Sequence, residues 1–402
     1  MQARLVVRNL YKVFGDQPDR AMALVREGAD KNAIFERTGQ TLGVIDANFE
    51  VREGEIFVVM GLSGSGKSTL VRLLNRLIEP SAGQVLFDGR DIAAMDDEAL
   101  RQMRRRHISM VFQSFALMPH LSVLDNTAFG LMLAGEDEAS RRQRAQAALA
   151  QVGLARWADS FPDELSGGMQ QRVGLARALA SDPDVLLMDE AFSALDPLIR
   201  TEMQDELVKL QAAHRRTIVF ISHDLDEAIR IGDRIAIMEG GRVIQVGTAE
   251  EILRAPANDY VRSFFRGVDA TRILSARDLA RRTQVNLIDH AGMGVRSALE
   301  RLRRHDRDYG YVVSAEQTLM GMVSVETLGE ALRTSTSAKL QDAFVPDLQR
   351  IAADVPISEL YDPLARHPYG LPVVDADGRY LGTVTRNAVL EFLHRNAPEA
   401  CP

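Results

Sequence analysis

The chain has 402 residues, enough for two or three domains that each bury a hydrophobic core. Its net charge of −8 weighs against nucleic acid as the main partner, and its single cysteine, Cys401, excludes a disulfide framework and a thiolate zinc cluster. No apolar run approaches the roughly 20 residues that span a bilayer, and the first residues lack the apolar core of a signal peptide. We therefore expect a cytoplasmic chain that meets a membrane only through a partner protein.

The first fifty residues predict strands that are separated by a helical insertion. Residues 4–14 are expected to form an edge strand, and further strands are predicted over 42–46 and 48–51. Between them, residues 17–40 have a helical pattern and no recognisable chemistry. The aromatic side chains within 4–14 could stack on a base, but their spacing favours a place in the core of the strand.

A glycine-rich loop at 61–69 is the most informative stretch of the sequence. It follows the apolar run 56–60, precedes a helical pattern and has the spacing G-x-x-x-x-G-K-S, which disfavours an ordinary turn. The backbone N–H groups of such a loop, with the following helix N-terminus, face an anion. Lys67 is expected to reach the β- and γ-phosphates of a nucleotide, and Ser68 to ligate Mg²⁺. The predicted nucleotide-binding residues of the loop are Gly61, Ser63, Gly64, Ser65, Gly66, Lys67, Ser68 and Thr69.

Two later apolar runs, 185–188 and 217–221, alternate with helical patterns over 97–106, 120–160 and 198–213. Continuous apolar strands that alternate with helices predict an α/β fold, with a mostly parallel sheet covered on both faces. Such sheets bind their ligands at the carboxyl ends of the strands.

An acidic pair, Asp189-Glu190, follows the run 185–188 and complements the phosphate loop. Asp189 is expected to hold Mg²⁺, directly or through water, and Glu190 to take a proton from the attacking water. The alternative is a solvated strand end, which the upstream phosphate loop disfavours.

The last third of the chain contains a weak internal repeat. Helical patterns at 297–304 and 357–365 each precede two strand patterns and a further helix, with an offset of about 60 residues. This arrangement predicts two similar units that pack together as a pseudo-symmetric pair.

With these motifs in order, the chain resembles the ATP-binding-cassette (ABC) ATPases. The resemblance rests on the phosphate loop and on four further motifs: Leu165-Ser166-Gly167-Gly168-Met169-Gln170-Gln171-Arg172, Asp189-Glu190, Ser193-Ala194-Leu195-Asp196 and His223. It implies a P-loop ATPase domain with a mostly parallel sheet, an antiparallel edge subdomain and a helical subdomain, followed by an α+β C-terminal pair of modules. The implied divisions are an ATP-binding domain at 1–265, its helical subdomain at about 114–180, a linker at 266–280, and two modules at 281–340 and 341–397.

The resemblance also implies roles residue by residue. Gln113 matches the position that touches Mg²⁺ and the attacking water, and His223 matches the γ-phosphate histidine. Phe14 matches the aromatic that stacks on adenine, with Tyr11 and Phe35 as alternatives because of the helical insertion. One ATP would then lie between two copies of the chain. The residues implied to act across that dimer are Ser166, Gly167, Gly168, Gln170 and Asp196.

Several segments narrow the family. The insertion, the segments 112–120 and 256–267 and the C-terminal repeat resemble those of the glycine betaine/proline-betaine importer ATPases. The resemblance implies a homodimeric ATPase subunit at the cytoplasmic face of the bacterial inner membrane, which uses ATP and Mg²⁺. Its implied partners are permease subunits and, through them, a solute receptor. The transported osmolyte itself cannot be read from these motifs.

The C-terminal repeat resembles tandem cystathionine-β-synthase (CBS) modules, many of which bind adenine nucleotides. Thr327 and Ala388 stand where such modules hold a ribose-binding aspartate, which weighs against a simple nucleotide sensor. A second possibility is ionic sensing, in which a group of arginines meets anionic lipid beside the permease. The competing interpretation, which the sequence favours, is a solvated helix face offset by Glu300, Asp306 and Asp308. These arginines are Arg281, Arg282, Arg296, Arg301, Arg303, Arg304 and Arg307.

Three other classes compete with a transport ATPase. A soluble cassette of translation or DNA repair would carry two cassettes or a long coiled-coil insertion, and an exporter ATPase would be fused to its membrane domain. A purely regulatory nucleotide-binding module would not need the base Glu190 or the histidine His223. The sequence therefore favours the transport ATPase.

Overall fold

The computed structural model describes residues 2–113, 116–266, 268–282, 285–288, 293–335 and 338–395. The chain folds into two compact units, Met1–Phe265 and Arg266–Pro402. Some residues named above lie outside the described residues: Ser114 and Phe115 of the segment 112–120, residues 396–397 of the second implied module, and Cys401. Among the helices described, none combines the length and the apolar composition that crossing a lipid bilayer requires.

A six-stranded sheet forms the centre of the first unit, with the strand order β10-β9-β3-β8-β7-β6. All neighbouring pairs are parallel except β9 and β10, which confirms the predicted α/β fold. Every residue of β3, β7 and β8 is buried, as expected of strands covered on both faces. The strands are β3 (Ile56–Met60), β6 (Ile108–Val111), β7 (Val185–Asp189), β8 (Thr217–Ser222), β9 (Arg234–Glu239) and β10 (Arg242–Gly247).

A second, antiparallel sheet has the order β2-β1-β4-β5. Its strands are β1 (Ala3–Phe14), β2 (Thr41–Arg52), β4 (Ala82–Phe87) and β5 (Arg90–Asp91). The prediction of an edge strand over 4–14 is wrong, because β4 pairs with the side of β1 that β2 leaves open. The two strands predicted over 42–46 and 48–51 form one continuous strand, β2. Its pairing with β1 shifts register at several positions.

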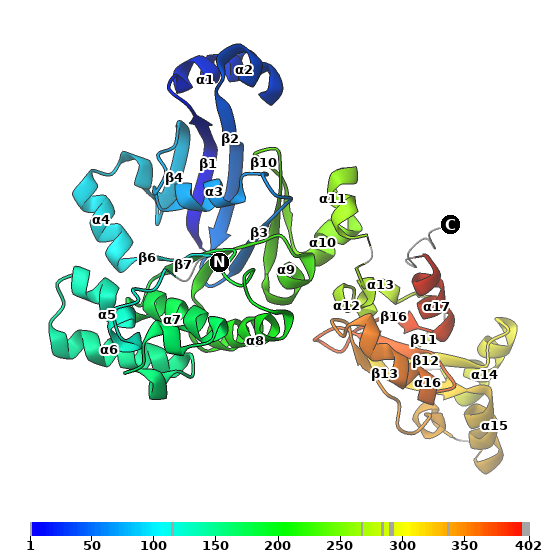
Figure 1. Ribbon diagram of the computed structural model, residues 1–402. Coiled ribbons are helices and arrows are strands. Elements are labelled where there is room, and N and C mark those ends of the chain that lie inside the picture. The colour runs from blue at the N-terminus through cyan, green and yellow to red at the C-terminus, as the bar shows by residue number, and fades with distance from the viewer. Residues whose placement is uncertain are drawn as a thin grey trace. The chain divides into compact units, whose positions relative to one another are not determined.

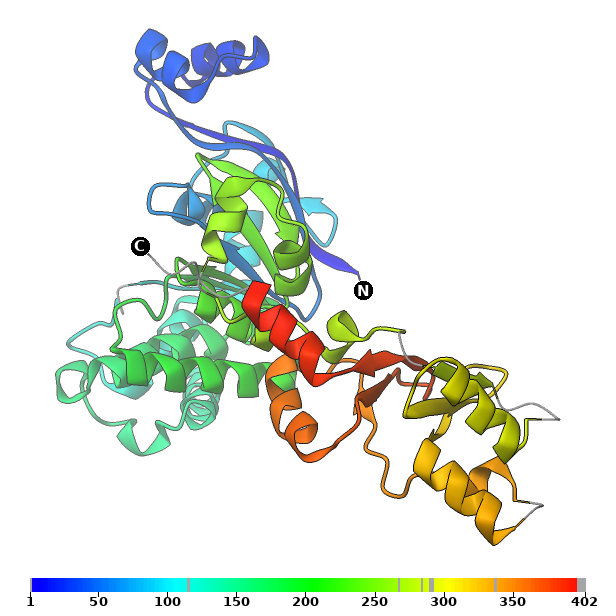
Figure 2. The same ribbon diagram turned by 90° about the vertical axis from the view of Figure 1, so that its right-hand side faces the viewer.

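Helices surround the sheets of the first unit. Figures 1 and 2 show α5, α6 and α7, in cyan to green, gathered into one helical layer, and the three helices pack on one another. The helical patterns predicted over 97–106 and 198–213 are confirmed as α4 and α8. The helices are α3 (Lys67–Leu74), α4 (Asp97–Arg106), α5 (Val123–Leu133), α6 (Glu138–Gln151), α7 (Gly167–Ala180), α8 (Pro197–His214), α9 (Leu225–Ile231), α10 (Ala249–Arg254) and α11 (Asp259–Phe264).

The insertion at 17–40 forms two helices, α1 (Pro18–Arg26) and α2 (Lys31–Thr38). Both lie at one end of β1 and β2 (Figure 1). They are held there by a small separate core of Val13, Ala21, Met22, Ile34, Leu42 and Ile45, to which the two strands also contribute. The insertion is therefore anchored to the strands rather than loosely attached.

The second unit contains the predicted repeat. Its two sheets, β11-β12-β13 and β14-β15-β16, each join a parallel pair to an antiparallel pair. Tyr311 and Tyr380, both buried, bring the halves together with ring centroids 5.2 Å apart. The strands are β11 (Val285–Ile288), β12 (Tyr309–Val313), β13 (Leu319–Ser324), β14 (Ile351–Ala352), β15 (Leu371–Val374) and β16 (Tyr380–Val384).

The helices of the second unit begin inside the stretch that the sequence assigns to a linker. Within 266–280 lie α12 and α13, and the first two residues of α13 donate backbone hydrogen bonds, Ala276 to Val355 and Arg277 to Ala353. Much of that stretch therefore packs within the second unit. The helices are α12 (Ala270–Ile273), α13 (Ala276–Leu279), α14 (Val295–Arg304), α15 (Val325–Thr334), α16 (Tyr361–Arg366) and α17 (Arg386–Arg395).

Candidate functional site

Three neighbouring parallel strands end at one edge of the central sheet. Met60 of β3 lies opposite Ser222 of β8, and Asp189 of β7 lies opposite Ile221. The loops that follow these strands therefore begin side by side, as expected for a ligand site at the carboxyl edge of a parallel sheet.

The phosphate loop wraps tightly before α3. Gly66, at the N-cap of that helix, has a φ of 103°, and a Cβ added there would lie 2.4 Å from the carbonyl oxygen of Gly43. Only glycine tolerates both conditions. The Nζ atom of Lys67 donates to the carbonyl oxygens of Gly61 and Leu62, at 2.9 and 3.2 Å. Burial lowers the pKa of Lys67, while the carboxylates of Glu190 and Asp189 oppose that shift.

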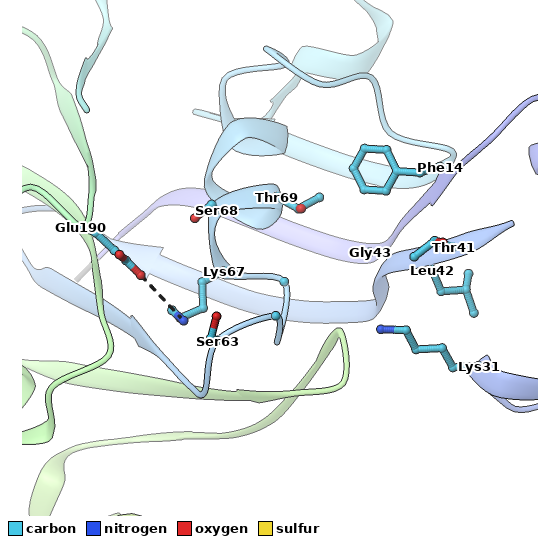
Figure 3. Close-up of a pocket in the computed structure, with 12 residues that line it drawn as sticks. Phe14, Lys31, Thr41, Leu42, Gly43, Ser63, Lys67, Ser68, Thr69 and Glu190 are labelled. Carbon is cyan, nitrogen blue, oxygen red and sulfur yellow. Dashed lines mark ion pairs between the residues drawn. The ribbon is translucent and has the colours of Figure 1, made fainter. Parts of the chain in front are cut away.

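A pocket of about 330 Å³ lies against this loop. Figure 3 shows Lys67 and Glu190 at one end of it, and Phe14 at the other. Most of the predicted loop residues line it, whereas Gly61 and Ser65 do not. The lining residues are Phe14, Lys31, Thr41, Leu42, Gly43, Ser63, Gly64, Gly66, Lys67, Ser68, Thr69 and Glu190.

The three residues assigned to catalysis meet at one carboxylate. Glu190 has a φ of 48°, an unusual value for a non-glycine residue that turns the chain sharply after β7. Its Oε1 atom lies 4.0 Å from Nζ of Lys67 and 3.9 Å from Nδ1 of His223. Nε2 of Gln113 donates to its Oε2 atom at 3.3 Å and to Oγ of Ser193 at 3.2 Å. A carboxylate held among these groups can accept a proton.

The residues assigned to Mg²⁺ offer only oxygen donors. Ser68 contributes a hydroxyl, Gln113 an amide oxygen and Asp189 a carboxylate, which is the donor chemistry that Mg²⁺ prefers. Asp189 is buried and pairs with Nη2 of Arg72 at 3.3 Å. These three side chains supply fewer oxygens than the six that Mg²⁺ prefers, so a cation held here would take further oxygens from phosphate or water.

The residues assigned to the opposite copy lie outside the lining of this pocket. Ser166 caps α7 and accepts from the N–H of Met169, and Asp196 caps α8 and accepts from that of Ile199. A Cβ on Gly168 would lie 2.5 Å from Cγ2 of Ile199, so the two capped helix ends meet closely. Ser166, Gly167 and Asp196 are exposed, whereas the amide of Gln170 donates to the carbonyl oxygens of Pro162 and Leu165. The N-termini of α7 and α8, with their exposed caps, therefore lie outside the lining of the chain's own pocket.

The structure distinguishes the three aromatic candidates. Phe14 is 39% exposed and lines the pocket, with its ring across Gly43, where an added Cβ would lie 2.6 Å from Cε2. Tyr11 packs against the small core of the insertion instead. Phe35 is 56% exposed on α2 and lies outside the lining. The geometry favours Phe14 as the ring that meets a base.

Three groups that shape the site were missed by the sequence reasoning. Lys31, from the insertion, lines the pocket, and nothing in its surroundings in the sequence marks it. Gly241, in the turn between β9 and β10, donates its N–H to the carbonyl oxygen of Ser65 at 2.9 Å and supports the loop from behind. Glu227 accepts from Ser222 and from Gln204, and so holds the segment before His223. For Gly241, the pair of glycines at 240–241 was the signal available in the sequence.

Comparisons with known proteins identify the family. The family model described as ABC transporter matches residues 44–193, and the CBS domain model matches residues 341–395. The glycine betaine/proline betaine transport system ATP-binding protein of Salmonella typhimurium is 59% identical over 396 residues, covering 98% of both chains. The glycine betaine transport ATP-binding protein of Bacillus subtilis is 46% identical over 393 residues, covering 98% of this chain and 93% of the relative.

A solved structure gives the same result for the first unit. It is the dimeric post-hydrolysis state of an ATP-binding cassette bound to ADP and phosphate, with a TM-score of 0.51 and 31% identity. The match covers 61% of this chain and 98% of that chain. Together with the relatives matched over nearly their whole length, this match identifies the family of the chain. The chain belongs to the ABC transporter family of ATP-binding ATPase subunits, and it carries a C-terminal CBS domain.

Proposed function

We propose that this chain powers the uptake of glycine betaine and related osmoprotectants, such as proline betaine and proline, across the bacterial inner membrane. The observation that carries the proposal is identity of 59% over 98% of the chain with a glycine betaine/proline betaine ATP-binding subunit. The chain would act at the cytoplasmic face of the membrane, bound to permease subunits that receive solute from a receptor.

The catalytic roles follow from the contacts of the pocket. Lys67 and the N-terminus of α3 would bind the β- and γ-phosphates, and Phe14 the adenine ring. Glu190 would accept the proton of the attacking water, with Gln113 and His223 fixing its carboxylate. Ser68, Gln113 and Asp189 would hold Mg²⁺, which supplies charge neutralisation to the phosphates when bound.

A second copy would complete the site. Ser166, Gly167 and Gly168, with Gln170 behind them and Asp196 beside them, would face the γ-phosphate held by the other chain. The exposure of Ser166, Gly167 and Asp196 at capped helix ends supports this role, as does the dimeric cassette to which the first unit is similar. ATP would then close the dimer and switch the permease, and hydrolysis would release it.

The second unit would regulate this cycle as a pair of CBS modules. The repeated topology supports extending the CBS match from 341–395 to the first half of the unit. Thr327 uses its hydroxyl to cap α15 together with Ser324, and Ala388 is buried, so neither position offers a carboxylate to a ribose. These two positions weigh against a nucleotide signal, and we propose instead an ionic signal, read by contact of exposed arginines with anionic lipid.

Within the arginine group, the structure separates two members from the rest. Arg281 pairs with Glu391, and Arg282 donates to the carbonyl oxygens of Leu381 and Tyr380. The arginines that remain as lipid contacts are all exposed on or just after α14. They are Arg296, Arg301, Arg303, Arg304 and Arg307.

Uptake in cells tests the proposed function. Cells that lack this chain are given radiolabelled glycine betaine, proline betaine or proline separately, in medium of raised osmolarity. The wild-type chain should restore uptake of at least one of these solutes, and Glu190→Gln should not. Wild-type chain that restores none of them would overturn the assignment of substrate class.

A further inference from the structure

The wall of the nucleotide pocket includes one residue of the helical insertion. Lys31 lines the same pocket as Lys67 and Glu190, although it comes from α2 and not from any motif of the cassette. Figure 3 shows Lys31 and Phe14 on opposite sides of Thr41 and Leu42, at the end of the pocket away from Glu190. The pocket therefore has two lysines, one at each end.

The position of Lys31 is fixed by its surroundings. It is the first residue of α2, and the carboxylate of Asp30 caps that helix by accepting from the N–H groups of Asn32 and Ala33. Ile34, one turn on, is fully buried in the small core that α1 and α2 share with β1 and β2. The strands that carry Phe14 and Gly43 thus also hold Lys31.

The ammonium group of Lys31 is available to a ligand. The side chain is half-buried, and among the residues that the structure describes no hydrogen bond or ion pair joins it to another group. The adjacent carboxylate, Asp30, is directed to the backbone of its own helix. A half-buried cation without a partner in the protein gains most from an electron-rich group brought into the same pocket.

We propose that Lys31 binds the nucleoside end of ATP, and that the insertion is thereby part of the nucleotide site. This inference rests on the proposed function, since it takes ATP as the ligand. The phosphates are assigned to the opposite end, where Lys67 and the N-terminus of α3 lie. Between Phe14 and Lys31 the base or the ribose meets an aromatic ring on one side and a cation on the other. The contact is independent of the γ-phosphate, so it holds ATP and ADP alike.

The test measures ATP and ADP affinity by calorimetry, in full-length chain that carries Glu190→Gln so that ATP persists. Lys31→Met keeps the apolar stem and removes the charge. We expect it to weaken both nucleotides by a similar factor, about 2- to 30-fold. Lys31→Arg should recover most of that loss. The matched control is Arg37→Met, which removes an exposed charge from the same helix outside the pocket lining and should change neither affinity.

Two results would overturn the inference. The first is an affinity of Lys31→Met equal to that of Arg37→Met. The second is a loss of ATP affinity several times larger than the loss of ADP affinity, which would assign the ammonium to the γ-phosphate. Lys67→Ala in the same assay separates this inference from the proposed function. If Lys67→Ala loses affinity while Lys31→Met does not, the ATP site stands and only the role of the insertion fails. If Lys67→Ala binds nucleotide as tightly as the parent Glu190→Gln chain, the assignment of the pocket itself fails.

Discussion

The Nζ atom of Lys67 lies 4.0 Å from Oε1 of Glu190, so the residue assigned to phosphate binding faces the residue assigned to proton transfer. The same carboxylate contacts Gln113 and His223. Two loops from separate strands, together with the phosphate loop, therefore converge on one acidic side chain. The chemistry of the site depends on that convergence more than on any single motif.

Glu190→Gln is the direct test of the base. The amide keeps the shape of the side chain but cannot accept a proton, so we expect ATP hydrolysis to fall by about 10²- to 10⁴-fold while ATP still binds. Because ATP then persists, the variant should form a dimer in ATP that light scattering detects and that ADP does not produce. Turnover near that of the wild type would remove Glu190 from the role of base.

Phe14→Ala tests which aromatic side chain meets the base. Loss of a stacking ring should weaken ATP about 5- to 150-fold, because base–aromatic stacking contributes about 1–3 kcal/mol. Phe35→Ala is the matched control, since that ring is exposed on α2 outside the pocket lining. Calorimetry with the Glu190→Gln chain measures both. Equal losses in the two variants would contradict the assignment of Phe14.

Gly168→Ala tests the close approach of α7 and α8. The added methyl group would lie 2.5 Å from Cγ2 of Ile199 in the same chain, so it should push apart the helix ends that carry Ser166 and Asp196. We expect hydrolysis to fall about tenfold or more, because aligned anion donors are lost from the opposite site.

Ile199→Ala separates two causes of that loss. Because the added methyl group points at Ile199, the double variant Gly168→Ala/Ile199→Ala should recover most of the hydrolysis, measured beside Ile199→Ala alone. A double variant that stays as low as Gly168→Ala would show that the methyl group obstructs the nucleotide instead.

Much of the fold was predictable because its signals are local. Uninterrupted apolar runs predicted the buried strands β3, β7 and β8, and their polar ends predicted the edge of the sheet where Glu190 and His223 meet. The phosphate loop was predictable from the spacing of its glycines, lysine and serine. These features need no knowledge of which distant segments pair.

The remaining features depend on pairing, which local patterns do not encode. That β1 is an inner strand follows only from β4, which lies about 70 residues later along the chain. Lys31 reaches the pocket because α2 packs on β1 and β2, and Gly241 supports the phosphate loop because β9 lies beside β3. Lysines and turn glycines occur in many structural settings. The residue types of Lys31 and Gly241 alone therefore gave no indication that they shape the nucleotide site.

Glu227 predicts a dependence of stability on pH. Burial raises the pKa of Glu227, Asp224 raises it further, and hydrogen bonds from Ser222 and Gln204 with the charge of Arg200 only partly oppose the shift. The folded chain therefore holds this proton more tightly than the unfolded chain does. Between the two pKa values the free energy of unfolding falls as pH rises, and above the folded value the full cost of burying the charge is present.

Glu227→Gln should remove that cost and raise the melting temperature at neutral pH. Its amide can still accept from Gln204 and bond with Ser222. As pH falls below the unfolded pKa, both states of the wild type are protonated and the difference from Glu227→Gln should vanish. Thermal unfolding across this range measures it, with the exposed Glu36→Gln as the control that should show little effect. A lower melting temperature for Glu227→Gln at neutral pH would mean that the carboxylate's hydrogen bonds outweigh its burial, and that the charged form is what holds the segment before His223.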